Sequence, residues 1–222
     1  MPIRRIRRAP LTVTAVLVAF AAFTACAQSA LAATLSPAGD GYKATATAVT
    51  FSVGAAGYNP YATCTLTVTG TVPNSGTTIK GSATFSSCEA AGEFKPGTVE
   101  VVATQPVQFS FKTGPPLQAA FSLPTSYGLE LALDNPLMGR CYLAQYNSYT
   151  NTSTRDTWQN GSNSPLVNSH SVLDERAIKA TKHGDCLEWP YSELVNVYMS
   201  TAPSHPLIWT DTTNPAKTIL FN

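Results

Sequence analysis

The three histidines of this 222-residue chain are the side chains best suited to acid–base or metal chemistry. His170, His183 and His205 all follow residue 150, and Asp185 lies two residues after His183. Imidazole and carboxylate groups together could hold a metal ion or assist a hydrolysis. However, the chain contains no HExxH motif, no GxSxG motif and no paired-histidine spacing. We therefore predict no catalytic residue, no metal ligand and no cofactor. A secreted hydrolase with its site around His170, His183 and Asp185 is the alternative.

Threonine occupies every second position over residues 63–71, and Cys, Leu, Val and Gly occupy the positions between. Side chains alternate between the two faces of a β-strand, so this pattern predicts a strand with one face on a core and the other in water. A regular row of hydroxyl groups could bind ice or a polysaccharide, or stack against a second copy of the chain. Because threonine is also common on the wet face of ordinary strands, a solvated face is the simpler interpretation.

All three tryptophans, Trp158, Trp189 and Trp209, also follow residue 150. Aromatic faces stack on sugars and lipids, and Tyr191 and Tyr198 lie near them in the sequence, so a carbohydrate platform is one hypothesis. Tryptophan more often packs a segment of chain onto a domain. We therefore expect buried anchors rather than a binding surface.

Four cysteines remain once a secretory signal is removed: Cys64, Cys88, Cys141 and Cys186. An even number in an exported chain indicates disulfides, and four cysteines allow three connectivities. Two alternating runs flank a turn at 73–76 and predict a β-hairpin in which Cys64 lies opposite about Phe85, close to Cys88. We therefore predict a Cys64–Cys88 bond. We also predict a Cys141–Cys186 bond, which would close the intervening region as a loop.

Residues 1–33 are typical of a secretory signal peptide. Four arginines at positions 4, 5, 7 and 8 precede an apolar run over 11–25, and Ala30-Leu31-Ala32 forms a cleavage site. The apolar run is too short to indicate a committed membrane span, so we expect no integral span after signal cleavage. A poor lipobox ends at Cys26, which would instead make the protein a lipid-anchored binding module of the cell envelope.

The charge balance excludes one class of partner. The whole chain has 14 basic and 13 acidic residues, and four of the basic residues are arginines of the signal. The mature chain therefore has ten basic and thirteen acidic residues, a net charge of −3. Nucleic-acid binding needs a basic stripe to contact phosphates, so we predict no nucleic-acid partner.

Eight short β-prone segments follow the signal, at 42–53, 63–72, 77–86, 99–103, 107–112, 117–123, 127–133 and 141–143. Turn residues separate them at close spacing. This pattern predicts a mainly β domain over 34–143, an antiparallel β-sandwich or a Greek-key-like barrel. We expect the segment at 42–53 to lie at or near an edge of the sheet.

The composition changes after residue 143. Residues 144–168 are rich in Asn, Ser and Thr and predict a linker or long loop. Residues 169–222 form a loop-rich C-terminal extension. Ser171 as an N-cap, Asp174 three residues later and Gly184 at the end predict one short helix over 172–182.

Three stretches carry a resemblance to a known family. They are Leu35-Ser36-Pro37-Ala38-Gly39, the threonine-rich strand that begins at Cys64, and Ala83-Thr84-Phe85-Ser86-Ser87-Cys88. Through them, residues 34–143 resemble small secreted bacterial proteins known as activators of alkane oxidation (PraB-like). The resemblance implies an exported, non-enzymatic protein associated with the cell surface or the biofilm matrix. It brings no catalytic residues, and residues 144–222 depart from its pattern.

The sequence as a whole predicts a secreted or cell-envelope interaction protein that is stabilised by two disulfides. Its expected partners are components of the cell envelope or the extracellular matrix, or a second copy of the chain.

Overall fold

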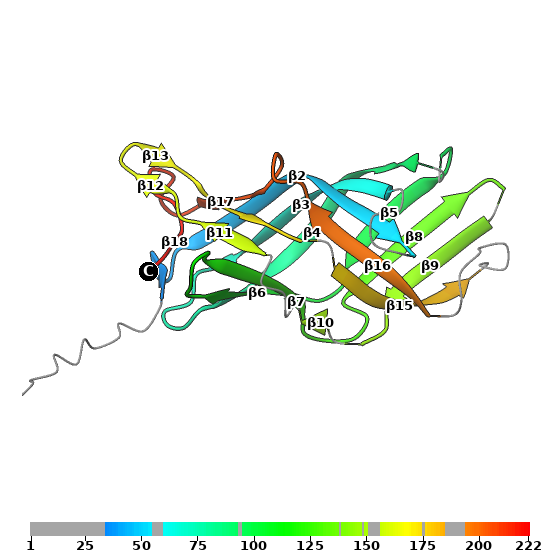
Figure 1. Cartoon of the computed structure of the whole chain (residues 1–222), viewed down its shortest axis with the longest axis horizontal. Helices are drawn as coiled ribbons and strands as arrows, with labels where there is room; N and C mark the ends of the chain where they lie inside the picture. Colours follow the sequence, from blue (N-terminus) through cyan, green and yellow to red (C-terminus); the bar gives the residue numbers. More distant parts are fainter. Residues whose placement is uncertain are drawn as a thin grey trace, which may run out of the picture. The chain divides into compact units, whose positions relative to one another are not determined.

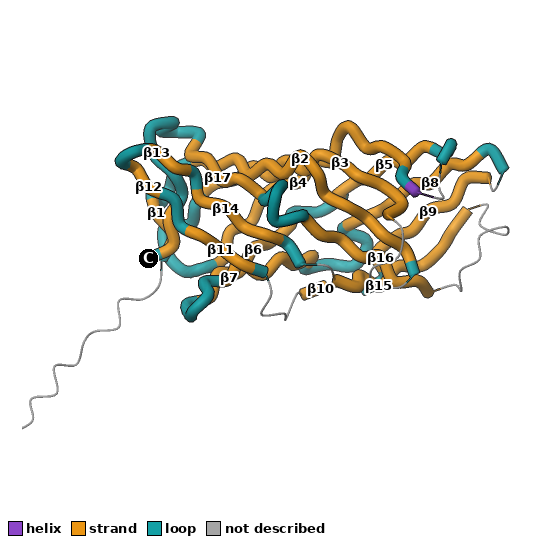
Figure 2. Tube along the Cα trace, turned by 45° about the horizontal axis from the view of Figure 1, so that its top comes forward, coloured by secondary structure: helices purple, strands orange, loops and turns teal. Residues whose placement is uncertain are grey.

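The structure is a computed structural model, and it describes residues 34–54, 60–92, 95–137, 139–147, 149–150, 156–174, 176–184 and 194–222. The described residues belong to one compact unit, Ala32–Asn222. They contain no α-helix, and strands make up most of them (Figure 2). Each strand pairing among them is antiparallel, so the prediction of a mainly β, antiparallel fold is confirmed.

The strands in chain order are β1 (Leu35–Ser36), β2 (Gly41–Val53), β3 (Pro60–Thr71), β4 (Thr78–Ala90), β5 (Thr98–Ala103), β6 (Val107–Lys112), β7 (Gln118–Leu123), β8 (Leu129–Asn135), β9 (Gly139–Gln145), β10 (Tyr149–Thr150), β11 (Thr157–Gln159), β12 (Ser162–Asn163), β13 (Leu166–Val167), β14 (Ser169–Val172), β15 (Arg176–Gly184), β16 (Leu194–Thr201), β17 (Leu207–Asp211) and β18 (Leu220–Phe221).

Three long strands, β2, β3 and β4, form the middle of one large curled sheet (Figure 1). At one end of these three strands, β6 and β7 extend the sheet beyond the first half of β4. At the same end, β17, β14 and β11 extend it beyond the first half of β2. The backbone N–H of Trp158 in β11 donates to the carbonyl of Leu117, just before β7, which closes these eight strands into a ring. At the other end, the sheet continues from the second half of β2 through β16, β15, β9, β8 and β5. The last of these, β5, returns to lie against β4.

Strand β2 lies inside the sheet rather than at its edge. Its first half pairs with β17, its second half pairs with β16, and its whole length pairs with β3. The expectation of an edge position for 42–53 is therefore wrong. Segments distant in sequence supply the strands that cover this edge, and the local pattern of residues 42–53 carries no information about them.

The alternation of residue types along β3 places its apolar side chains in the core. Leu66 and Val68 are fully buried, whereas Thr65 and Thr67 between them are half-buried on the outer side. Fully burying a side chain such as Leu or Val stabilises the fold by about 1.5–3 kcal/mol. Strands β2 and β4 add Phe51, Val49 and Ile79 to the same core.

The hairpin of β3 and β4 forms as predicted, but its register differs by two residues from the expectation. Phe85 pairs with Leu66 rather than with Cys64. The reason lies at the turn, where Val72 exchanges backbone hydrogen bonds with Gly39 and Asp40 instead of pairing with Thr77. A register shift between Thr63 and Thr65 then marks a β-bulge.

The helix expected over 172–182 is wrong. Strand β15 covers Arg176–Gly184 and lies between β9 and β16, paired on both sides. The groups that suggested a helix start have other partners: the Ser171 hydroxyl accepts a hydrogen bond from Trp209 Nε1 (2.9 Å), and the Asp174 N–H donates to Asp156 Oδ1 (2.8 Å). Tertiary pairing thus overrides the local capping signal.

The region expected as a linker and a loop-rich extension supplies β10, β11 and β14 to β17 to the same sheet, and it also contains the separate two-stranded sheet of β12 and β13. Residues 144–168 contain β11 and the β12–β13 hairpin, and β14 to β17 follow. Strand β18 pairs with β1, which joins the C-terminal strand to the start of the described chain. Asn160 stabilises this junction by bonding both the backbone N–H and the carbonyl of Phe221.

Candidate functional site

The outer sides of β2, β3 and β4 carry a continuous set of hydroxyl groups. Three rows run across the strands in register: Thr45, Thr67 and Thr84; Lys43, Thr69 and Ser82; and, on β3 and β4 alone, Thr65 and Ser86. We call the hydroxyl-bearing members of these rows, together with Thr63 and Thr71, the hydroxyl face. Strand β3 alone suggested this face in the sequence, and the structure adds the hydroxyls of the two neighbouring strands.

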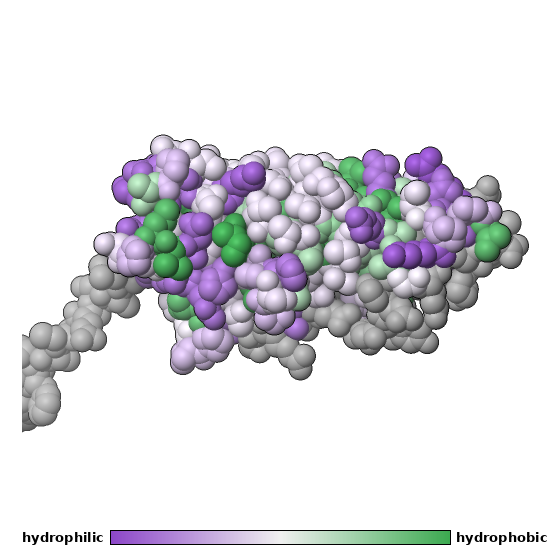
Figure 3. All heavy atoms as spheres, turned by 90° about the horizontal axis from the view of Figure 1, so that it is seen from above, coloured by the Kyte–Doolittle hydropathy of each residue, from purple (hydrophilic) through white to green (hydrophobic). Residues whose placement is uncertain are grey.

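The residues of the hydroxyl face are accessible. The outward residues of β4, including Ser82, Thr84 and Ser86, are exposed, and Thr65 and Thr67 of β3 are half-buried between the flanking strands. Figure 3 looks down on the molecule of Figure 1 and shows a broad area of near-neutral hydropathy in the middle, on the side where β2 and β3 run. Strongly hydrophilic residues gather towards both ends of this view.

The hydroxyl face has donors and acceptors but no activated group. Within the described residues, none of its side chains has a hydrogen-bond partner in the protein; Thr63 lies opposite Glu89 in register, and no described hydrogen bond joins the two. An unactivated Ser or Thr hydroxyl is a weak nucleophile. The arrangement therefore suits binding through many hydrogen bonds and does not suit catalysis.

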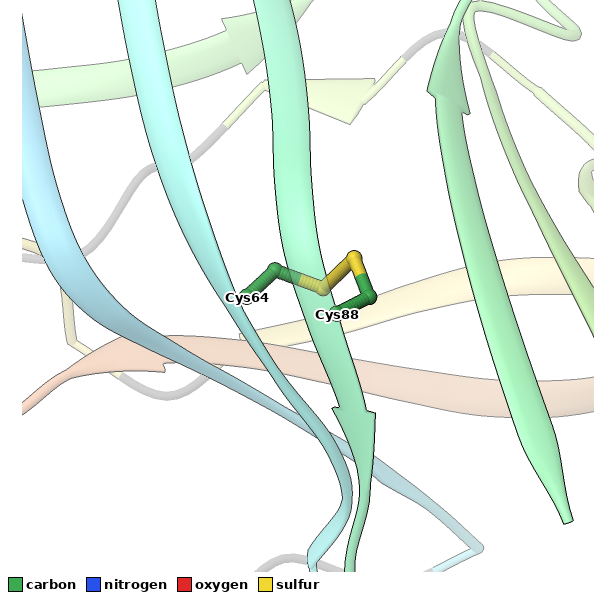
Figure 4. The surroundings of a disulfide bond; sticks show 2 residues. All are labelled: Cys64 and Cys88. Atoms are coloured by element: carbon green, nitrogen blue, oxygen red, sulfur yellow. A yellow bond between two sulfur atoms is a disulfide. The ribbon is translucent and has the colours of Figure 1, made fainter.

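The disulfide between Cys64 and Cys88 joins β3 to β4 at one end of the hydroxyl face (Figure 4). The two Cα atoms are 4.1 Å apart, and Cys64 is buried on the core side. The predicted bond is thus confirmed, and it lies beside the bulge, where Ser87 has a φ of 50°. By linking the two strands, the disulfide restricts their sliding and helps to hold the rows of hydroxyls in register.

The second disulfide stays a prediction, because Cys186 lies outside the described residues. Cys141 is fully buried in β9, and it pairs in register with Gly184 of β15. Gly184 precedes Cys186 by two residues. This register is compatible with the predicted Cys141–Cys186 bond.

Each of the three histidines has different neighbours. His170 lies in β14 opposite Gln159 and Ile208, and His205 has an exposed hydrogen bond of its Nδ1 with the Ser204 hydroxyl (3.0 Å). His183 lies at the end of β15, beside Glu130 and Tyr142. No described contact brings two histidines together, and Asp185 and Glu188 lie outside the described residues. Among the residues that are described, no three His, Cys, Asp or Glu side chains are grouped as metal ligands.

A second polar cluster lies on β8, β9 and β15, and the sequence indicated only one of its members, His183. His183 Nε2 is 3.3 Å from Glu130 Oε2, and the His183 ring stacks on Tyr142 with centroids 5.0 Å apart. The Arg140 guanidinium lies 5.2 Å from the centroid of the same tyrosine ring. The imidazole is half exposed, so water screens its contact with Glu130 and the contact contributes little to stability. The pairing of β9 with β8 on one side and with β15 on the other brings these residues together.

Two of the three tryptophans are core residues. Trp158 and Trp209 are 2% and 0% exposed, and their ring centroids lie 5.4 Å apart. Phe111 packs edge-on against both. The prediction of buried anchors is confirmed for these two, and Trp189 lies outside the described residues.

Tyr42 supports the hydroxyl face from the core side. Its ring lies over Gly70 and Gly81, which pair with each other in β3 and β4, so the two glycines leave the space that the ring fills. The phenol oxygen is buried and has no hydrogen-bond partner among the described groups. Burial therefore raises the pKa of Tyr42 above its ordinary value, because the phenolate would lose its hydration.

Comparisons with known proteins returned no significant match: no family model, no curated protein and no solved structure matches this chain. In the described part of the chain, no helix is long and apolar enough to cross a membrane.

Proposed function

We propose that this protein is a secreted, non-enzymatic interaction protein of the cell surface or extracellular matrix, and that the hydroxyl face is its contact surface. The observation that carries the proposal is the set of hydroxyls in register on three adjacent strands, which have no hydrogen-bond partner among the residues that the structure describes. Such groups offer both donors and acceptors to a polar surface. The Cys64–Cys88 bond is consistent with an oxidising environment outside the cytoplasm.

Export itself rests on the signal-like residues 1–33, and we propose that cleavage follows the Ala-x-Ala site. N-terminal sequencing of the mature protein tests this step. A mature chain that begins after residue 30 supports a secreted protein. A chain that begins with a lipid-modified Cys26 would instead indicate an envelope-anchored module.

Binding to cells tests the contact surface. Purified mature protein is incubated with cells or envelope fragments of the producing organism, and the bound fraction is measured by sedimentation. The variant Thr65→Val/Thr67→Val/Thr69→Val removes three hydroxyls and keeps β-branched residues that favour the strand. We expect its bound fraction to fall at least fivefold.

Two further variants separate the face from general surface effects. Thr67→Lys places a long charged side chain in the centre of the face and should also reduce binding. Thr98→Lys makes the same change at an exposed position of β5, away from β3, and should bind like the wild type. Binding by the triple variant and by Thr67→Lys at wild-type level would refute the role of the hydroxyl face.

A further inference from the structure

We propose that the ligand of the hydroxyl face is a neutral polysaccharide chain. This inference rests on the proposed function of that face and names the class of partner. It follows from three properties of the face: the residue types it lacks, its charge, and the spacing of its hydroxyls.

The hydroxyl face lacks the residues that anchor protein partners. Interfaces between proteins depend on a few buried aromatic, arginine or large apolar side chains at their centre. The outward positions of β2 over 43–45, of β3 over 63–71 and of β4 over 80–86 carry only Thr, Ser and Lys. A second copy of the chain, or another protein, would find no anchor there. A hydroxylated polymer needs none, because it binds through hydrogen bonds along its length.

The hydroxyl face lacks the pattern of charges that a charged polymer would need. Lys43 and Lys80 lie towards one end and Glu89 lies at the other, beside the disulfide, while the rows between them are uncharged. Binding of a polyanion such as a nucleic acid or a uronic-acid polymer depends on a stripe of cations along its path. Two lysines confined to one end do not make such a stripe.

The spacing of the hydroxyls suits a chain with many hydroxyls of its own. Adjacent strands in a sheet are about 4.8 Å apart, and every second residue along a strand recurs at about 6.8 Å. Each hydrogen bond to such an exposed group is weak, because water competes for it. A polymer gains affinity by making many of them at once on one molecule.

The irregularities of the sheet favour a flexible ligand over a crystal surface such as ice. Strand β2 has a register shift between Ala46 and Val49, and β3 has another between Thr63 and Thr65. Together with the normal twist of a sheet, these shifts interrupt the repeat of the hydroxyls. A polysaccharide can follow an uneven path of donors and acceptors, whereas a rigid lattice cannot.

Affinity electrophoresis tests the proposal. The mature protein is run in native gels that contain dextran, mannan, galactomannan or hydroxyethyl cellulose, and in parallel gels that contain polygalacturonate. We expect retardation in at least one neutral gel and none in polygalacturonate. The Thr65→Val/Thr67→Val/Thr69→Val variant should lose at least 80% of the retardation, and Thr98→Val should keep it. Circular dichroism of each variant verifies that the fold is intact.

Three results would overturn the proposal. They are no retardation in any neutral gel, retardation that the triple variant keeps, or retardation in polygalacturonate alone. Analytical ultracentrifugation adds a separate arm: a dimer that the triple variant abolishes would identify a second copy as the occupant. If the face is required for binding to cells but no neutral polysaccharide is retained, the ligand class is wrong while the proposed function stands. If the triple variant binds to cells like the wild type, the proposed function itself fails.

Discussion

Substituting Gly81 by alanine should destabilise the sheet beneath the hydroxyl face. A Cβ atom at this position would lie 2.7 Å from the carbonyl oxygen of Thr69 and 2.8 Å from Val68 Cγ1, and it would also meet the hydroxyl of Tyr42. Real Cβ atoms essentially never approach other heavy atoms this closely. The contact with Thr69 is with the backbone of the neighbouring strand and cannot be relieved by a rotation, and the Val68 side chain is buried and β-branched, so it has little freedom to rotate away.

The expected cost lies at the upper end of the range for overpacking, about 3 kcal/mol of unfolding free energy. For a domain of this size, about 3 kcal/mol corresponds to a decrease in Tm of about 6–12 °C. Urea unfolding followed by tryptophan fluorescence measures the change, because Trp209 contacts the Tyr42 ring with centroids 5.3 Å apart. Ser82→Ala, at the exposed next position of β4, is the control and should change stability by less than about 0.5 kcal/mol.

A double-mutant cycle with Tyr42→Phe tests the packing argument itself. Removing the phenol oxygen relieves one of the three close contacts and leaves those to Thr69 and Val68. The cost of Gly81→Ala should therefore fall by about 1 kcal/mol in the phenylalanine background, and it should not vanish. If Gly81→Ala costs less than about 0.5 kcal/mol, or if its cost is the same in both backgrounds, the described packing of Tyr42 against the two glycines is wrong.

Three further outcomes follow from the same structure. Because burial raises the pKa of Tyr42, the folded state favours the neutral phenol. This contribution to stability is complete below the ordinary tyrosine pKa of about 10 and is lost as the pH rises above it. Tyr42→Phe should therefore unfold at a higher pH than the wild type in an alkaline titration. Equal midpoints would show that another group controls alkaline unfolding. Replacing Cys64 and Cys88 by alanine should cost about 3.5 kcal/mol, from a sequence separation of 24 residues, and denaturant unfolding would contradict this if the loss were below about 1 kcal/mol. Glu130→Gln should change stability by less than about 1 kcal/mol, because its contact with His183 is partly exposed to water, and a larger loss would indicate a stronger coupling than the geometry supports.

The sequence predicted the strands well where residue types alternate with a period of two. The segments at 42–53 and 107–112 correspond closely to β2 and β6, and the segment at 117–123, which lacks the alternation, also corresponds to β7. It also predicted the Cys64–Cys88 bond, although the hairpin register behind that prediction was wrong by two residues. The predicted bond is nevertheless correct, because the bulge beside Thr63 and the longer turn together bring the two cysteines into contact.

The candidate site was predicted only in part. The threonines of β3 are visible as a pattern in one strand, but the neighbouring hydroxyls of β2 and β4 belong to the face only through the pairing of three strands. Of the cluster of Glu130, Tyr142 and His183, the sequence singled out only His183, since the contact depends on the pairing of β15 with β9, which is distant from it in the chain. Side-chain spacing along one segment cannot reveal such neighbours.

Local alternation, turn residues and cysteine content were enough to specify a disulfide-containing, mainly β chain, because they act between residues close in sequence. Which strands became neighbours was decided by the tertiary structure. Residues 176–184 show this difference: Ser171 and Asp174 favoured a helix there, but pairing with β9 and β16 satisfies the backbone on both sides and buries Ile178 and Ala180. Long-range hydrogen bonding and burial outweighed a local capping preference worth about 1 kcal/mol. The same long-range pairing assembled the hydroxyl face from three strands.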